Sequence, residues 1–570
     1  MKTRFSTTVS FLMTIVLIVG MLAGCRNNTA STPEPAPAAT AAATATPAPA
    51  ATEAASAPSA NQVVNTDPLG KYDPPITVSF VVPRNHPDVV PPEGQTPLDN
   101  DWLDIYREEL GIIADIWWVA ADETKQKTDL MIASGQIPDI LSFYSPATYE
   151  ELYEAKMIQP ITEVYDTYAT PLLRGLLESD GGHAYGLYDR GGDKYALFFF
   201  LEPSEDYLML WVREDWRLNL GLGEPKTLDD MRKMAAAFTH DDPDQNGADD
   251  TTGFTFDNTF GFKLDGFFAA YNAYPRLWIR DANNNVISGK EDVPAMKAAL
   301  TALQDMYKAG EIWQEFITAD ATQMAERINT NKTGMLFEVW WYPIWPFQTG
   351  VNNDPTTDWR CFPIPTENGQ PGLTPAKKVI PSWFYVTRAG FEYPEATIKM
   401  GNIYAEKYYG ESAKDGYPVY EIWKWTSVCV ESLTKEMDSY RKIQKALQTG
   451  DDSTITTAND KMRWIYAQTA FTGDPADWSA TRTWGPGPET SYALLEKILD
   501  NKWYMPDEHF GAPTESMINK QEIIDKIFSE TIFKIIVGES QVDAYDAMLA
   551  QYKALGGDDI AREVQAIYEK

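Results

Sequence analysis

The chain has 570 residues, of which 44% are hydrophobic and 12% aromatic, so it can bury more than one hydrophobic core. Its 48 Lys and Arg stand against 82 Asp and Glu, which gives a formal net charge of -34. This balance argues against nucleic-acid binding, which needs cations to neutralise phosphates, and against electrostatic docking on an anionic membrane. It also disfavours an acidic ligand, although a local Arg or Lys could still bind one.

The first residues have the layout of a secretory signal. Lys2 and Arg4 precede an apolar run from about residue 11 to 22, and small residues lead to Cys25. The stretch LAGC resembles the bacterial lipobox, in which the cysteine is lipidated and becomes the first mature residue. A signal anchor retained in the membrane is the alternative. We expect residues 1–24 to be a signal peptide and Cys25 to be a lipid anchor that holds the protein on the outer face of the cell membrane.

Residues 25–70 are expected to form a tether between this anchor and the folded body. Ala, Thr and Pro dominate the segment and no apolar pattern appears, so it is predicted to be disordered and partly extended. About 40 residues at roughly 3 Å each would reach on the order of 100 Å from the membrane. No later stretch is apolar for long enough to span a bilayer, so the lipid is the only expected membrane contact.

An α/β pattern opens the folded body. Three apolar, β-rich stretches come first, at residues 76–82, 113–120 and 138–145. A helical pattern follows each of the first two, and strands that alternate with helices at this spacing predict a parallel sheet. Ligands of such sheets bind beyond the carboxyl ends of the strands. Arg84 and Tyr144 stand at those ends and are candidate ligand-binding residues.

A second pattern begins near residue 205 with the strand-like stretch YLMLWV. Arg213 and Asp215 follow it directly and are candidates for polar contacts with a ligand, with a surface or interlobe salt bridge as the alternative. Thr227 and Asp230 then predict a capped helix. Beyond about residue 260 the chain is mostly helical, and its last stretch is interrupted only at glycines.

The loop DDPDQNGADDTTG matches most of the EF-hand spacing. Oxygen ligands would come from Asp242, Asp244, Asn246, the carbonyl of Ala248 and Asp250, around a glycine at the sixth position. A dication would cancel the repulsion among these carboxylates. A glycine replaces the bidentate Glu at the twelfth position, which favours a structural calcium over a regulatory one. A solvated acidic turn is the alternative, because Asp, Asn and Gly favour turns.

Several ordered motifs run through the body: LMIASGQIPDIL, VREDWRLNLGLGEPKTLDDM, the acidic loop, YPEATIKMGNIY and the closing IFKIIVGES. Together they resemble extracellular solute-binding proteins of carbohydrate ABC importers, in particular the large lipoproteins of Firmicutes. The resemblance implies a two-lobed α/β fold like that of periplasmic binding proteins (class II type), with a hinge, a central ligand cleft and a helix-rich second lobe. It also implies a monomer that captures an oligosaccharide by lobe closure and delivers it to a membrane permease.

The division into lobes is expected from the same resemblance. The N-terminal α/β lobe would comprise residues 71–200 plus about 333–390, and the C-terminal lobe residues 201–332 plus about 391–570. Because such bodies cross between their lobes more than once, these boundaries are approximate.

Aromatic side chains are the candidates for stacking on the apolar faces of a sugar. The stretch EVWWYPIWPF contains two prolines and is therefore predicted to form a loop that offers rings to the ligand. The candidate rings are Trp278, Trp340, Trp341, Trp345 and Trp383. Packing in the core is the alternative for each of them.

A secreted glycoside hydrolase and a surface glycan-binding adhesin are the rival functions. A hydrolase needs two carboxylates at a defined separation, and among 82 Asp and Glu such a pair is available by chance. The four His show no paired metal spacing and no nucleophile elbow occurs, so binding without catalysis is expected.

Two cysteines remain beyond the anchor, Cys361 and Cys429. They would form one disulfide in an oxidising compartment or remain as two buried thiols. We expect thiols, because a chain of this size needs no covalent staple.

Overall fold

The structure is a computed structural model that describes residues 66–82, 92–119, 124–200, 202–376, 381–414, 425–509 and 513–568. The predicted signal peptide, Cys25, nearly all of the tether and Arg84 lie outside these residues. Residues 64–570 form one compact unit. Within the described ranges, no helix combines the length and the apolar composition that a membrane span requires.

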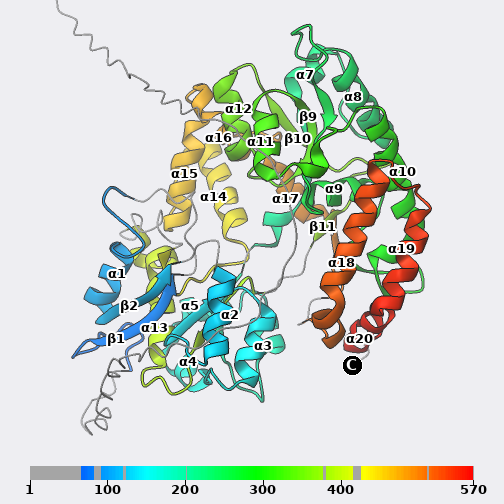
Figure 1. Cartoon of the computed structure of the whole chain (residues 1–570). Helices are drawn as coiled ribbons and strands as arrows, with labels where there is room; N and C mark the ends of the chain where they lie inside the picture. Colours follow the sequence, from blue (N-terminus) through cyan, green and yellow to red (C-terminus); the bar gives the residue numbers. More distant parts are fainter. Residues whose placement is uncertain are drawn as a thin grey trace, which may run out of the picture. The chain divides into compact units, whose positions relative to one another are not determined.

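The first lobe forms around a five-stranded sheet (Figure 1). Its strands are β1 (Ile76–Val82), β2 (Ile112–Val119), β3 (Ile140–Phe143), β4 (Ala196–Phe199) and β12 (Trp383–Thr387). Their order is β2-β1-β3-β12-β4. Strand β1 pairs in parallel with β2 and β3, which confirms the prediction from alternating strands and helices. Strand β12 returns from much later in the chain and runs antiparallel to β3 and β4.

Seven helices belong to this lobe in the described part of the chain. They are α1 (Asp101–Ile105), α2 (Thr124–Ser134), α3 (Pro146–Glu154), α4 (Thr162–Tyr168), α5 (Pro171–Leu177), α6 (His183–Tyr188) and α13 (Glu395–Tyr409). The side chain of Asn100 accepts hydrogen bonds from two backbone N–H groups at the start of α1, as its position predicts. Gly111 ends the turn that follows with φ +67°, and a Cβ there would lie 2.4 Å from the carbonyl oxygen of Tyr72. The chain therefore needs a glycine at this position before it can enter β2.

The second lobe contains a four-stranded sheet with the order β10-β5-β9-β6 and two short ribbons. The sheet strands are β5 (Met209–Arg213), β6 (Thr252–Phe254), β9 (Thr333–Glu338) and β10 (Trp359–Phe362). The ribbons pair β7 (Trp278–Arg280) with β8 (Val286–Ser288), and β11 (Thr374–Ala376) with β13 (Tyr504–Pro506). Strand β5 runs antiparallel to β9, whereas β6 runs parallel to it.

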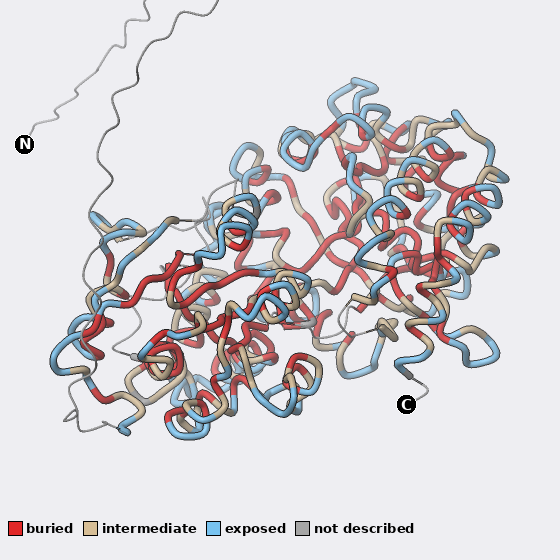
Figure 2. Tube along the Cα trace, turned by 60° about the horizontal axis from the view of Figure 1, so that its bottom comes forward, coloured by how far each residue is buried: buried red, intermediate tan, exposed pale blue. Residues whose placement is uncertain are grey.

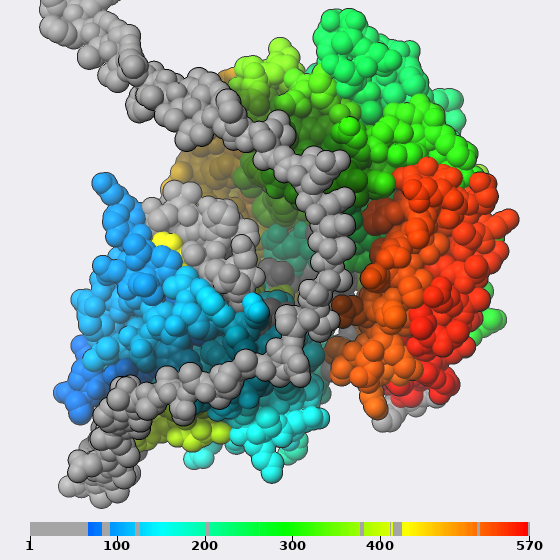
Figure 3. Space-filling view, in the orientation of Figure 1, coloured from blue at the N-terminus to red at the C-terminus, as the bar shows by residue number. Residues whose placement is uncertain are grey.

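Helices make up most of the second lobe, as predicted. They are α7 (Glu214–Asn219), α8 (Leu228–His240), α9 (Phe262–Ala270), α10 (Val293–Lys308), α11 (Ala321–Asn329), α12 (Gln348–Asn353), α14 (Lys435–Thr449), α15 (Ala458–Thr469), α16 (Trp478–Thr483), α17 (Ser491–Asn501), α18 (Glu515–Ile536), α19 (Ala544–Tyr552) and α20 (Asp558–Tyr568). Thr227 and Asp230 form the predicted capping box of α8. Helices α18 to α20, orange to red in Figure 3, form a continuous part of the surface of this lobe.

The two hydrophobic cores show how the chain divides between the lobes. The first core takes its side chains from residues 76–200 and 384–433 with Ala458, and the second from residues 207–376 and 437–564. Figure 2 shows the buried stretches running through the interior, with exposed stretches along the outer turns of helices. The expected boundaries differ from this division in two segments, 333–376 and 391–433. An apolar pattern indicates a strand or a helix but not the lobe in which that element packs. Strands β9 and β10 pair with β5 in the second lobe, whereas α13 packs on the first core.

The cysteine prediction is confirmed in the described residues. Cys361 and Cys429 are both buried thiols that form no disulfide. Cys361 packs in the second core and Cys429 in the first. Burial raises the pKa of Cys361 to about 12, which keeps this thiol protonated and unreactive.

Candidate functional site

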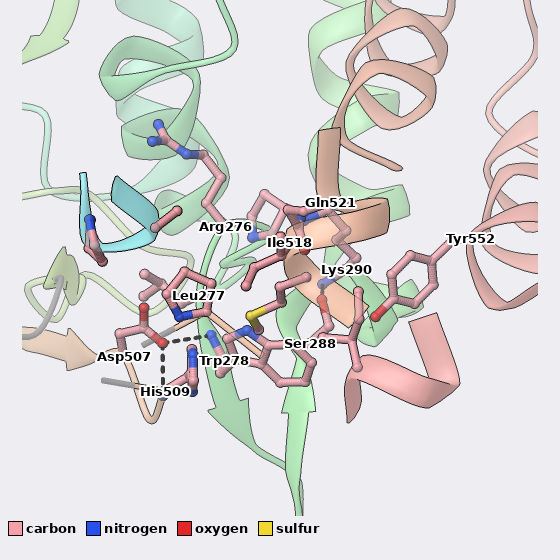
Figure 4. Close-up of a pocket in the computed structure, with 16 residues that line it drawn as sticks. Arg276, Leu277, Trp278, Ser288, Lys290, Asp507, His509, Ile518, Gln521 and Tyr552 are labelled. Carbon is pink, nitrogen blue, oxygen red and sulfur yellow. Dashed lines mark hydrogen bonds between the residues drawn. The ribbon is translucent and has the colours of Figure 1, made fainter. Parts of the chain in front are cut away.

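A cavity of about 520 Å³ lies beside α18 in the second lobe (Figure 4). Its lining combines aromatic, apolar and polar side chains, which is typical of a small-molecule site. The lining includes Trp278, Lys290, Arg276, Met517, Gln521 and His509. Pro146 and Ala147, at the start of α3, also line it.

The ribbon of β7 and β8 places Trp278 in the cavity wall. Trp278 pairs with Ser288 across the ribbon, and the chain then turns at Gly289. A Cβ on Gly289 would lie 1.9 Å from the carbonyl oxygen of Tyr274, so the backbones approach too closely for any other residue. This close approach brings the next residue, Lys290, into the same wall as Trp278.

A short segment after β13 fixes the other side of Trp278. Asp507 Oδ1 accepts hydrogen bonds from the backbone N–H of Trp278 at 3.0 Å and of His509 at 3.1 Å. The rings of Trp278 and His509 meet edge to face, with their centroids 6.3 Å apart. The backbone of Trp278 is therefore fixed by Asp507, and its ring packs against His509 while it lines the cavity. A rigid stacking surface requires such support.

One face of α18 supplies the opposite wall. Met517, Gln521 and Asp525 are four residues apart, so they project from the same side of the helix. Met517 and Gln521 line the first cavity. Gln521 and Asp525 line a second cavity of about 460 Å³. Thr514 caps the start of the helix by accepting a hydrogen bond from the backbone N–H of Met517.

Two cationic side chains, Arg276 and Lys290, line both cavities. Lys290 is only 6% exposed, and its Nζ lies 3.4 Å from Oδ1 of Asp525 and 5.0 Å from the ring centroid of Phe528. Arg276 donates a hydrogen bond of 2.9 Å to Asp265. Burial lowers the pKa of Lys290, and the nearby charge of Arg276 acts in the same direction. The wall that the two cavities share thus carries two cationic side chains, each beside a carboxylate.

Two predicted rings of the first lobe lie together. Tyr144 directly follows β3 and Trp383 opens β12, and because these strands are antiparallel neighbours their ends coincide. The ring centroids of Tyr144 and Trp383 are 5.6 Å apart in an edge-to-face arrangement, and Tyr144 is 49% exposed. The pair lies at the carboxyl edge of the parallel strands, where the sequence predicts ligand contacts.

The Pro-rich stretch after β9 differs from its prediction as a ligand-binding loop. Trp340 is buried, its Nε1 donates to Glu205 at 2.9 Å, and its ring packs on Tyr492. Trp341 is half-buried, and Trp345 is exposed at 46%. None of the three lines the cavities beside α18. Both prolines lie in a short, kinked helical turn, and most of the segment packs on the core while Trp345 stays exposed.

Arg213 and Asp215 require a correction. Strand β5 is antiparallel to β9, so its carboxyl end lies beside the start of β9, at the opposite edge of the sheet from Trp340. The guanidinium of Arg213 makes a bidentate pair with Asp215, donates to Asn331 and lies on the ring of Trp216. Arg213 is 1% exposed, so the pair is structural rather than part of a ligand site.

The acidic loop is folded by its own side chains. Asp242 accepts backbone N–H bonds from Asn246 and Gly247, and Gly247 has φ +78°. Asp244 accepts from the amide of Asn246 through Oδ2, while its buried Oδ1 has no hydrogen-bond partner. Burial and neighbouring carboxylates raise the pKa of Asp244.

One position in this loop departs from the EF-hand expectation. Asp250 is paired with the ammonium of Lys332, which lowers the pKa of that carboxyl. In the described part of the chain, no group of three His, Cys, Asp or Glu side chains is arranged to hold a metal ion. Asp242, Asp244 and Asn246 still present the oxygen donors that calcium prefers, and the unpartnered oxygen of Asp244 fits a cation.

Buried carboxylates gather where the chain crosses between the two cores. Glu202 accepts hydrogen bonds from Ser204 and from the backbone N–H of Glu436, the second residue of α14. Burial, together with the charges of Glu205 and Glu436, raises the pKa of Glu202 to about 8. Burial would also raise the pKa of Glu436, but its ion pair with Arg463 outweighs this and lowers it.

The side chains around the cavity were mostly missed by sequence reasoning. Arg276 stands two residues before the predicted Trp278, and that spacing was the one available signal. Lys290, His509 and Gln521 belong to a turn, a segment after a short strand and a helix, none of which carries a motif. Lys290 and His509 come together because β7 pairs with β8 and the segment after β13 lies against β7, while Gln521 belongs to α18.

The chain is similar to sugar-binding proteins of known name. No family model matches the chain. It is 28% identical over 220 residues to the fructooligosaccharide ABC transporter substrate-binding protein FusA of Streptococcus pneumoniae, covering 36% of this chain and 37% of FusA. It is 22% identical over 485 residues to the polygalacturonan/rhamnogalacturonan-binding protein YtcQ of Bacillus subtilis, covering 80% of this chain and 85% of YtcQ. The lipoprotein LipO of the same bacterium is 24% identical over 242 residues, covering 39% and 43%.

Solved structures show the same fold. FusA in complex with kestose matches with a TM-score of 0.60 at 17% identity, over 87% of this chain and 99% of that structure. The alginate-binding protein AlgQ2, solved without calcium ion, matches with a TM-score of 0.59 at 17% identity, over 88% and 99%. A further FusA structure is of an EF-hand mutant. The chain thus has the α/β fold of periplasmic solute-binding proteins, which confirms the predicted fold class. Its sequence matches to FusA and LipO span less than half the length of those two relatives.

Proposed function

We propose that this chain is the carbohydrate-binding component of an ABC importer, which captures an oligosaccharide and delivers it to a membrane permease. The observation that carries this proposal is the cavity beside α18, in a chain with the fold of sugar-binding proteins. Trp278 offers an aromatic face for the C–H side of a sugar ring. Gln521, Arg276 and Lys290 offer donors for its hydroxyl groups.

We include the aromatic pair of the first lobe in this site. Tyr144 and Trp383 lie at the ligand-binding edge of their sheet, and Pro146, two residues after Tyr144, lines the cavity. A sugar that contacts both lobes would stabilise a closed form, which is the physical basis of capture by hinge closure. The permease would then recognise that closed form. Small-angle scattering with and without sugar tests this: the radius of gyration should fall on binding, and an unchanged value would favour a rigid adhesin.

We also propose that the protein binds its sugar without breaking any bond in it. The test is to incubate the purified protein with kestose, nystose, oligogalacturonate and alginate oligomers, and to follow both heat of binding and new reducing ends. We expect heat from at least one oligosaccharide and no new reducing ends from any. Release of reducing ends would instead identify a glycoside hydrolase.

We also propose that the acidic loop holds a structural calcium. Asp242, Asp244, Asn246 and the carbonyl of Ala248 would bind it, and the ion would offset the repulsion among the carboxylates. Asp250 would join them only after it leaves Lys332. Addition of a chelator should then lower the melting temperature by a few degrees. In Lys332→Met, which removes the competing ammonium, calcium should bind more tightly. Equal binding to both forms would contradict Asp250 as a calcium ligand.

The lipid anchor at Cys25 completes the proposal, and it is supported by the lipoprotein among the relatives. The protein expressed in its host should partition with the membrane fraction on the outer cell surface. Cys25→Ser should move it to the medium without changing its melting temperature. If the variant stays with the membrane, a retained signal anchor holds the chain instead.

A further inference from the structure

The ammonium of Lys290 has unused capacity for hydrogen bonds. It carries three N–H donors, and its one ion-pair partner in the described residues, Asp525, is 3.4 Å away and 54% exposed. A buried cation with a single ion-pair partner is costly, so a cavity wall keeps one mainly where a ligand supplies a further acceptor. The backbone fixes its place: the carbonyl of Lys290 accepts a 2.6 Å hydrogen bond from Tyr545.

The surroundings of Lys290 decide which acceptor fits. Arg276 adds a second positive charge to the wall shared by the two cavities, and Lys526 lines the second cavity. Against them stand Asp265, which is paired with Arg276, and Asp525. These side chains leave one positive charge in excess, so one carboxylate of a ligand would balance the charge at this wall. A doubly charged group such as a phosphate monoester would be repelled there by Asp265 and Asp525.

We propose that the site beside α18 binds a carbohydrate that carries carboxylates, a uronic acid oligosaccharide, and that Lys290 contacts a ligand carboxylate. This inference rests on the proposed function and narrows its substrate class. It reverses what the net charge of -34 alone indicates, because binding depends on the few charges around the ligand rather than on the total. The apolar rings and Met517 would hold the sugar faces, and Lys290 would select the acid.

The experiment compares two ligands that differ only in charge. Trigalacturonate and its carboxyl-reduced, neutral counterpart are titrated calorimetrically into the full-length mature protein, alongside kestose as an unrelated neutral sugar. We expect the acid to bind at least about tenfold more tightly than its reduced form. Lys290→Met should lose most of that preference and Lys290→Arg should keep part of it. Lys297→Met, which removes a lysine outside both cavities, should behave as wild type.

Each result separates this inference from the proposed function. Equal or tighter binding of a neutral sugar would overturn the inference and leave the transport function in place. A preference for the acid that Lys290→Met leaves unchanged would overturn the role of Lys290. Absence of binding to all three sugars would count against both. The comparison of ligands on the wild-type protein needs no variant, so a misfolded variant cannot leave the question open.

Discussion

Trp340 and Trp278 show that an aromatic residue in a promising stretch of sequence is not the same as an aromatic residue in a site. Trp340 belongs to a Pro-rich aromatic run, yet its ring is buried against Tyr492 and its N–H is bonded to Glu205. Trp278 stands in an unremarkable stretch, but backbone contacts from two distant segments place it in a cavity wall. The difference lies in the tertiary partners, which local composition does not encode.

The largest expected difference between a buried and an exposed ring is in stability. Trp340→Ala should lower the free energy of unfolding by about 3–5 kcal/mol, because it opens a cavity in the core and leaves the carboxylate of Glu205 without its donor. Chemical unfolding measures this. Trp345→Ala is the matched control, since that ring is 46% exposed and its loss should cost less than about 1 kcal/mol. Similar costs for both variants would show that the stretch does not pack as described.

A second stability effect is expected at the opposite edge of the second sheet. Arg213→Ala should cost about 3 kcal/mol, because it leaves Asp215 without its buried partner and uncovers Trp216. Arg107→Ala, which breaks an exposed pair with Asp104, should cost under about 1 kcal/mol. Sugar affinity should be unchanged in both, as measured by calorimetry. A selective loss of affinity in Arg213→Ala would return this residue to the ligand site.

The complementary prediction concerns binding. Trp278→Ala should weaken oligosaccharide binding about tenfold or more through loss of the stacking surface, with a small change in melting temperature. Trp345→Ala removes a ring of the same kind outside the cavities and should leave the affinity within about twofold. The reverse pattern would restore the Pro-rich stretch as the ligand platform.

The smallest effect is a change in pH dependence at the crossover between the cores. Because the pKa of Glu202 is raised to about 8 in the fold, the native state keeps a proton that the unfolded chain releases above its ordinary value near 4.5. The contribution of Glu202 to the free energy of unfolding is therefore most favourable at low pH and falls as the pH rises toward 8. In Glu202→Gln the melting temperature should fall less steeply between pH 5 and about 8. An identical slope in both proteins would contradict a buried, protonated Glu202.

Much of the fold follows from local signals, whereas the site follows from contacts over long distances. Thr227 caps its helix where predicted, and the parallel pairing of β1 with β2 and β3 was predicted from spacing. The direction of β5 was not, because an isolated strand carries no information about its partner; this misplaced Arg213. Of the predicted rings, Trp278 lines the cavity, and Tyr144 and Trp383 lie together at the edge of the first sheet. The position of Lys290 in the cavity wall depends on the close approach of the backbones at Gly289 and Tyr274, which a single sequence does not reveal.

A crystal structure of the protein with the oligosaccharide that binds most tightly would test the central claim most directly. We expect a sugar ring stacked on Trp278, with an acidic group within hydrogen-bond distance of Lys290 and contacts to Tyr144 or Trp383. A sugar bound along residues 340–345, or one that touches neither Trp278 nor Lys290, would contradict it.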